Sequence, residues 1–158
     1  MKLSTRGRYA VMAMADLARH AGGAPGHEPV RLCEIAGRQE ISLSYLEQLF
    51  AKLRRGGLVV AARGPRGGYR LARAASETRI ADIIFAVDEP IKATRCRTGS
   101  SEGCLGRTGR CLTHDLWEEL GRQIEVFLES VTLTDVLERR VLGRARPVGT
   151  ADSPRAAA

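Results

Sequence analysis

The stretch from residue 32 to residue 71 constrains the fold more than any other part of this 158-residue chain. It contains two short segments with an apolar stripe, a polar break between them and a glycine-rich turn. The second segment, from Ile41 to Arg55, repeats apolar residues at the spacing of a helix with one buried face: Leu46, Leu49, Phe50 and Leu53. Gly56-Gly57 then provides the left-handed backbone position at which such a helix ends. The stretch therefore predicts two short helices followed by a turn into extended chain.

These two predicted helices have the layout of a helix-turn-helix, with residues 37–40 as the polar turn. In that layout the start of the second helix is exposed and can meet base edges. It carries five polar side chains: Ser42, Ser44, Tyr45, Glu47 and Gln48. Ser44 and Glu47 have the spacing of a capping box, and Ser42 is an alternative N-cap. Taken alone, these groups could equally cap and solvate an ordinary helix.

A hairpin with a basic tip is predicted directly after the second helix. Residues 58–63 read as a strand and residues 69–71 as its return, with Gly64-Pro65-Arg66-Gly67-Gly68 between them. A hairpin in this position is the wing of a winged helix. Arg63 and Arg66 would then reach the adjacent minor groove or the DNA backbone.

The charge of the chain supports a nucleic-acid partner. Residues 1–80 contain 14 Lys and Arg against 6 Asp and Glu, whereas residues 81–158 contain 11 against 12. The whole positive excess therefore lies in the half that holds the predicted helix-turn-helix and wing. Because a basic surface attracts polyanions, this half is expected to bind a double-stranded DNA operator.

The remaining predicted helices surround this unit. Residues 6–19 are apolar on most faces, which predicts a buried central helix with Asp16 as its one interior charge. Residues 78–87 place Ile80, Ile83, Ile84 and Val87 at core spacing. A long helix is expected from His114 to about Ser130, and a short one within 132–141. The long helix has an apolar side made of Leu116, Trp117, Leu120, Ile124, Phe127, Leu128 and Val131.

The expected fold is therefore mostly α with a small β-hairpin. A small winged-helix domain has no room to bury so long an additional helix, so the long helix is expected to pair with its copy in a homodimer. Packing within the chain is the alternative. The predicted organisation is a DNA-binding domain at 1–80, a cysteine-containing loop with dimerisation helices at 81–141 and a disordered tail at 142–158.

Residues 95–114 hold three of the four cysteines, Cys96, Cys104 and Cys111, followed at once by His114. The residues between them are mostly Gly, Ser, Thr and Arg, which cannot bury apolar surface or sustain a helix. Metal ligation would order such a segment, and the Cys-x2-His spacing is typical of metal ligands. A loop that merely happens to carry cysteines is the alternative. The fourth cysteine, Cys33, is expected to be a small core residue.

The chain has no apolar run long enough to cross a membrane and no secretory apolar region at its start, so a cytoplasmic protein is expected. In that reducing compartment, clustered cysteines are metal ligands or redox sensors rather than structural disulfides. The sequence shows no paired carboxylates, no nucleophile with a matching base and no phosphate-binding loop. An enzyme is therefore not expected.

Over roughly residues 1–140 the sequence resembles the IscR family of iron–sulfur-cluster-sensing winged-helix transcription regulators. The resemblance rests on six segments: Leu3-Ser4-Thr5-Arg6-Gly7-Arg8-Tyr9-Ala10-Val11, Ile41-Ser42-Leu43-Ser44-Tyr45-Leu46-Glu47-Gln48-Leu49-Phe50, Arg63-Gly64-Pro65-Arg66-Gly67-Gly68-Tyr69, Val87-Asp88-Glu89, Ala93-Thr94-Arg95-Cys96 and Cys111-Leu112-Thr113-His114.

The resemblance implies a homodimeric regulator, mainly a repressor of cluster-assembly genes, whose cluster occupancy changes its operator preference. It implies a 2Fe–2S cluster, supplied by the cluster assembly machinery and held by Cys96, Cys104, Cys111 and His114. It also implies base contacts from Ser44, Glu47 and Gln48, with Arg63 in the minor groove.

The intervals between the three cysteines, seven and six residues, are longer than the family pattern. The longer loop costs little closure entropy. Three other functions stay open: a related nitric-oxide- or iron-responsive repressor with a different fourth ligand, a repressor with structural zinc, and a small iron–sulfur electron carrier. Thiolate and imidazole ligands suit both zinc and iron.

Overall fold

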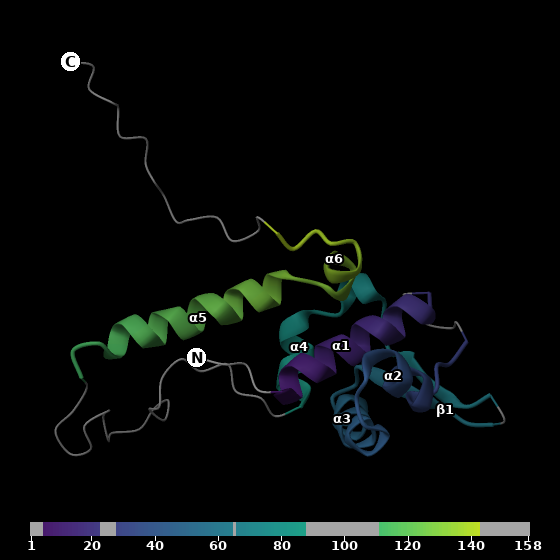
Figure 1. The fold of residues 1–158 in the computed structure, drawn as a ribbon. Coiled ribbons are helices and arrows are strands. Elements are labelled where there is room, and N and C mark those ends of the chain that lie inside the picture. The colour runs from purple at the N-terminus through teal and green to yellow at the C-terminus, as the bar shows by residue number, and fades with distance from the viewer. Residues whose placement is uncertain (1–4, 23–27, 65, 88–110, 143–158) are drawn as a thin grey trace.

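A computed structural model of the chain describes residues 5–22, 28–64, 66–87 and 111–142. Its elements, in chain order, are α1 (Thr5–His20), α2 (Leu32–Gln39), α3 (Leu43–Arg55), β1 (Val59–Ala62), β2 (Gly68–Leu71), the 3-10 turn η1 (Ala75–Glu77), α4 (Ile80–Ala86), α5 (His114–Ser130) and α6 (Leu133–Leu137). The predicted fold class, mostly helical with one antiparallel hairpin, is confirmed (Figure 1). Cys96, Cys104 and the predicted tail lie outside the described residues, apart from Leu142.

Helix α1 runs through the middle of the domain, with α3 and the hairpin on one side and α6 on the other (Figure 1). It buries Ala10, Ala13, Met14 and Leu17 completely. The expectation of a helix buried on all faces is only partly right, because Val11 and Ala15 are half-buried and Met12 is 37% exposed. These three residues line a groove of about 540 Å³ that also touches α2 and α6. Neither neighbouring helix covers this strip of α1.

Asp16 connects α1 to α2. Its carboxylate is buried, and Arg38 donates to it from Nε, whose N–H is shared between the two oxygens at 3.1 Å each, and from Nη2 to Oδ1. The amide of Gln39 donates to Oδ2 at 2.7 Å. Burial is the largest single influence and raises the pKa of Asp16. The hydrogen bonds from Arg38 and Gln39 and the charges of Arg38 and His20 together outweigh it, so the pKa lies below its ordinary value. The buried Asp16 carboxylate therefore links α1 to α2 through side-chain hydrogen bonds.

Replacing Asp16 with asparagine is expected to lower the free energy of unfolding by about 2 kcal/mol at neutral pH, the scale of buried hydrogen bonds to a charged group. The partly exposed Arg38 side chain can regain water, which limits the loss. Because the folded-state pKa of Asp16 is lowered, its contribution is complete above the unfolded-state pKa and disappears as the pH falls through the folded-state pKa. Urea unfolding from neutral to acidic pH should show the two proteins converging in stability. A difference that stays constant with pH would contradict this account.

Helix α3 begins one residue after Ser42, whose Oγ accepts a 3.3 Å hydrogen bond from the backbone N–H of Tyr45. The alternative N-cap is therefore the correct one, and Ser44 lies inside the helix rather than at its cap. At the other end, Gly57 adopts a φ of +70°. Hydrogen bonds from Leu58 N to Leu53 O (3.0 Å) and from Gly57 N to Arg54 O (3.1 Å) complete a Schellman motif. This motif turns the chain from α3 into the wing.

Strands β1 and β2 pair antiparallel, with Val59 opposite Leu71 and Ala62 opposite Gly68. The hairpin is held to the body in two ways. Tyr69 exchanges backbone hydrogen bonds of 2.8 and 2.9 Å with Val30, and its ring packs edge-on against Phe50 of α3, with 4.9 Å between centroids. A Cβ on Gly68 would lie 2.4 Å from the Val30 carbonyl oxygen, so only glycine permits this approach. The wing is therefore anchored to α3 and to the segment that leads into α2.

The C-terminal elements fold back onto the first half of the chain. Ile80 N donates to Val131 O at 2.9 Å and Leu133 N donates to Thr78 O at 2.8 Å, and α6 packs against α1 and η1. Residues of α4 and the 131–133 segment belong to the same hydrophobic cluster as α1 and α3. This core therefore continues across residue 80, and the division at 80 and 141 stays a prediction.

Helix α5 projects from this body and contacts it chiefly through α4 (Figure 1). Its bounds agree with the predicted helix. The first part of its apolar side is left uncovered by the described residues: Leu116 is 62% exposed, Trp117 44% and Leu120 37%. Further along, Phe127 and Leu128 are half-buried against the core, and Val131 is buried in it. Among the described residues, no helix is long and apolar enough to span a bilayer.

Candidate functional site

The start of α3 presents the polar side chains that the helix-turn-helix layout predicted. Ser42, Ser44, Glu47 and Gln48 are exposed, whereas Tyr45 is half-buried. The Tyr45 ring packs edge-on against Tyr9 of α1, with 6.1 Å between centroids and 81° between planes. Exposure makes the other four side chains available to a ligand, and the aromatic contact holds the first part of α1 against the start of α3.

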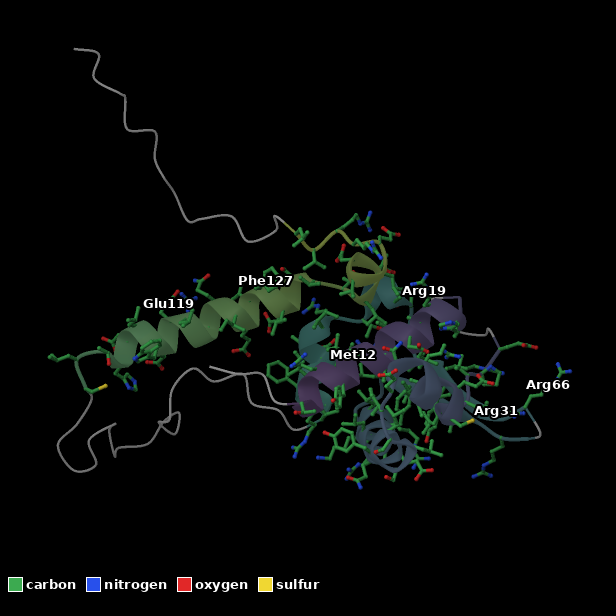
Figure 2. The ribbon with its side chains drawn as sticks, in the orientation of Figure 1. Met12, Arg19, Arg31, Arg66, Glu119 and Phe127 are labelled. Atoms are coloured by element: carbon green, nitrogen blue, oxygen red, sulfur yellow. The ribbon has the colours of Figure 1, made fainter. Side chains whose placement is uncertain are left out.

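The wing brings its two predicted arginines to the surface. Arg63 and Arg66 are exposed, and Figure 2 shows Arg66 extending from the tip of the hairpin. Arg66 Nη1 lies 3.5 Å from Glu28 Oε1, but both side chains are almost entirely exposed. An exposed ion pair of this kind contributes little, so it would readily exchange for a phosphate contact.

Sequence reasoning missed Arg31. This exposed residue precedes α2 and follows Val30, whose backbone pairs with Tyr69 of the wing. Figure 2 shows Arg31 on the same side of the molecule as Arg66. The local sequence does not show that Arg31 lies near the wing, because this placement depends on the Val30–Tyr69 bridge, which joins residues 39 positions apart. The cationic side of the wing is therefore built from two distant parts of the chain.

Cys33 is exposed, so the expectation of a core cysteine is wrong. Helix α2 has eight residues and buries only Ile35 fully, with Leu32 and Ala36 half-buried. Cys33 lies two residues, about 200°, around the helix from Ile35, on the side away from α1 and α3. Its apolar neighbours in the sequence therefore do not share its face.

The described part of the cysteine segment places Cys111 and His114 in the turn that starts α5. His114 is the first residue of α5, and its backbone N–H donates to Cys111 O at 3.0 Å. The imidazole is largely buried and the Cys111 side chain is half-buried, with Sγ 3.6 Å from Thr113 Oγ1. One sulfur and one nitrogen donor are thus held within a single turn.

A carboxylate that sequence reasoning did not single out lies beside this turn. Glu118 Oε2 is 3.3 Å from His114 Nε2, one helical turn further along α5. Potential ligand atoms of His114, Asp115 and Glu118 all lie within 4.8 Å of one another. The spacing i, i+4 could have revealed the pair once the helix start was known.

Known proteins resemble this chain over most of its length. The model of the Rrf2 family, described as iron-dependent transcriptional regulators, matches residues 3–139. The HTH-type transcriptional regulator IscR of Photorhabdus laumondii is 51% identical over 140 residues, which are 89% of this chain and 81% of that protein. The protein of the same name from Cereibacter sphaeroides is 48% identical over 141 residues, 89% and 90% of the two chains.

Two solved structures have the same fold. IscR of T. potens superposes with a TM-score of 0.68 at 38% identity, covering 89% of this chain and 88% of its own. CymR of B. subtilis, titled the global cysteine regulator, has a TM-score of 0.69 at 31% identity, covering 88% and 98%.

The family match confirms that the function is regulatory rather than enzymatic. It also confirms the resemblance on which the DNA-binding interpretation partly rests. The exposed start of α3, the anchored arginine wing and a family match over residues 3–139 lead to one conclusion: the chain belongs to the Rrf2 family of iron-dependent, DNA-binding transcriptional regulators.

Proposed function

We propose that this regulator senses an iron–sulfur cluster and acts mainly as a repressor of cluster-assembly genes in the cytoplasm. Cluster occupancy would change which operators it prefers, and the assembly machinery would be the cluster source. The observation that carries the proposal is the joint position of Cys111 and His114 at the start of α5, in a chain about 50% identical to regulators named IscR.

The donor set fits an iron–sulfur cluster. Soft thiolates and an imidazole are ligands that iron–sulfur centres accept. Cys111 and His114 would supply one of each, and Cys96 and Cys104 would complete a 2Fe–2S site. When bound, such a cluster supplies a centre whose occupancy and charge can change, with a higher reduction potential than an all-cysteine site because imidazole replaces a thiolate.

On DNA, α3 would lie in the major groove with Ser42, Ser44, Tyr45, Glu47 and Gln48 facing the duplex, while Arg63 and Arg66 of the wing would reach the minor groove or the backbone. Gln and Ser can pair with base edges directly. Glu47 is repelled by phosphates unless it accepts a hydrogen bond from a cytosine amino group. It would therefore distinguish between operators rather than add affinity.

Helices α5 and α4 would connect the proposed cluster site to the DNA-binding surface. Helix α5 starts at the proposed ligands and packs against α4, which in turn packs against α1 and α3. The exposed apolar side of α5 would pair with the same surface of a second copy, giving a homodimer that presents two α3 helices to an operator. A cluster that orders the start of α5 can thereby bias the DNA-binding helices.

Replacing Arg63 with alanine is expected to weaken operator binding about tenfold, because minor-groove and phosphate contacts of arginine are worth roughly 1–3 kcal/mol. The slope of log affinity against log salt should also decrease by about one unit. Fluorescence anisotropy on an operator duplex at several salt concentrations would measure both. Arg122→Ala, which removes the same charge from α5, is the matched control. Equal losses in the two variants would contradict a specific role for the wing.

The proposal is tested on protein purified without oxygen. Visible absorption bands that bleach in air, with about equal amounts of iron and sulfide, are expected from the wild type and not from Cys111→Ser. DNase footprints of the loaded and cluster-free dimers on its own promoter should differ. A colourless protein that contains zinc would overturn cluster sensing while leaving a DNA-binding repressor, and identical footprints would overturn the switch.

A further inference from the structure

We propose that Glu118 is a positioning residue that orients the His114 imidazole so that its Nδ1 atom, not Nε2, is offered to the metal centre. The inference rests on the proposed cluster and names a residue and a ligand atom that the cysteine and histidine spacing does not specify. It is carried by the 3.3 Å approach between Glu118 Oε2 and His114 Nε2.

The chemistry of the carboxylate and the imidazole determines which ring nitrogen of His114 carries the proton. A carboxylate can only accept a proton, so a neutral imidazole beside it places its N–H on Nε2. A metal binds only the unprotonated ring nitrogen, which is then Nδ1. Carboxylates that receive the second N–H of a ligating histidine are common around metal sites, where they set the ring orientation and raise the basicity of the ligand.

The geometry favours retention of this orientation. The His114 side chain is only 11% exposed, so its ring has little room to rotate, and its backbone is tied to Cys111 O at 3.0 Å. Glu118 is 54% exposed, so solvent screens part of its charge. Glu118 therefore acts on His114 mainly by orienting the ring and by holding the proton on Nε2, and less through the electrostatic effect of its charge.

Asp115 is the one other carboxylate whose ligand atom falls in this group of three, within 4.8 Å of the other two. It is close enough to His114 to take over the role of Glu118. Its variant therefore belongs in the test. Glu119 provides the matched control, because it lies on the same helix but pairs with Arg122 and Gln123 at 2.6–2.9 Å, away from the ring.

The first measurement compares Glu118→Gln, Asp115→Asn and Glu119→Gln with the wild type, all loaded with cluster without oxygen. Removal of the cluster by a chelator is expected to be about 10- to 100-fold faster in Glu118→Gln, the usual cost of losing such a partner. Its midpoint potential should also rise, because a less basic imidazole stabilises the oxidised cluster less. The other two variants should behave like the wild type. Equal unfolding free energies would separate this effect from general loss of stability.

The second measurement identifies the ligand atom. Protein labelled with 15N only at the Nδ1 atoms of histidine is reduced and studied by pulsed electron paramagnetic resonance. Strong coupling to the labelled nitrogen is expected in the wild type. Strong coupling to the unlabelled nitrogen, or Glu118→Gln indistinguishable from Glu119→Gln, would overturn the inference while leaving the cluster intact. A wild type without any cluster signal would instead overturn the proposed function, and this inference with it.

Discussion

Replacing Phe50 with alanine is expected to lower the free energy of unfolding by about 3–5 kcal/mol, the usual cost of deleting a buried aromatic side chain. Phe50 is completely buried in α3, and its ring meets Tyr69 of the wing edge-on. The substitution therefore leaves a cavity and also removes the aromatic contact that anchors the hairpin. Because a typical domain has only about 5–15 kcal/mol of stability, the variant should be partly unfolded at physiological temperature.

Urea unfolding at one fixed protein concentration would measure this loss, since the stability of a dimer depends on concentration. Phe85→Ala is the control, because the same side chain is 42% exposed on α4 and its removal leaves no cavity in the domain. Phe50→Ala should also weaken operator binding under conditions where it remains folded. A loss no larger than that of Phe85→Ala would show that Phe50 does not hold the core together.

Replacing Leu120 with glutamate is expected to convert the proposed dimer into a monomer. Leu120 is 37% exposed on the apolar side of α5, so the monomer can accept the charge at little cost. In a dimer the carboxylate would be buried without a partner, which costs several kcal/mol. The dimer dissociation constant should therefore rise at least about 100-fold, and operator affinity should fall with it because each monomer reaches a single half-site.

Light scattering or sedimentation across a concentration series would give the mass. Val126→Glu also replaces an apolar residue of α5 with glutamate, at a side chain that is 50% exposed and about 120° around the helix from Leu120, and it should remain a dimer. A Leu120→Glu protein that is still dimeric would place the dimer contact elsewhere on the molecule. A wild type that is monomeric at all concentrations would remove the dimer from the proposed function.

Features that depend on neighbouring residues were predicted well. The buried stripe of α3 and its ending at Gly56-Gly57 follow from side-chain periodicity and backbone conformation. The hairpin between residues 58 and 71 follows from apolar segments around a glycine-rich turn. The core residues of α4 follow from the same helical spacing. In each case the physical cause is local, because a helix or a tight turn joins residues only a few positions apart.

The errors lie where distant elements meet. Cys33 shares its sequence neighbourhood with apolar residues but faces solvent, because it lies on the opposite side of α2 from the buried Ile35. The burial of α1 was overestimated at Met12, because periodicity cannot say which neighbouring helices will cover a face. The binding of Asp16 by Arg38 and Gln39 joins residues more than 20 positions apart.

By itself, the sequence determined the helix-turn-helix, the wing and the closeness of Cys111 to His114, since each is a pattern within a short window. It also determined the basic half, because charge can be counted without knowledge of the fold. Only the tertiary structure decided that Arg31 lies on the same side as the wing. The i, i+4 spacing allows Glu118 to meet the His114 ring, but the side-chain rotamers decide that it does so. The tertiary structure also decided that Leu116, Trp117 and Leu120 on the apolar side of α5 are left largely uncovered by the described part of the chain. These three features depend on which surfaces pack together and on side-chain rotamers, and packing is chosen by the whole core rather than by any one segment.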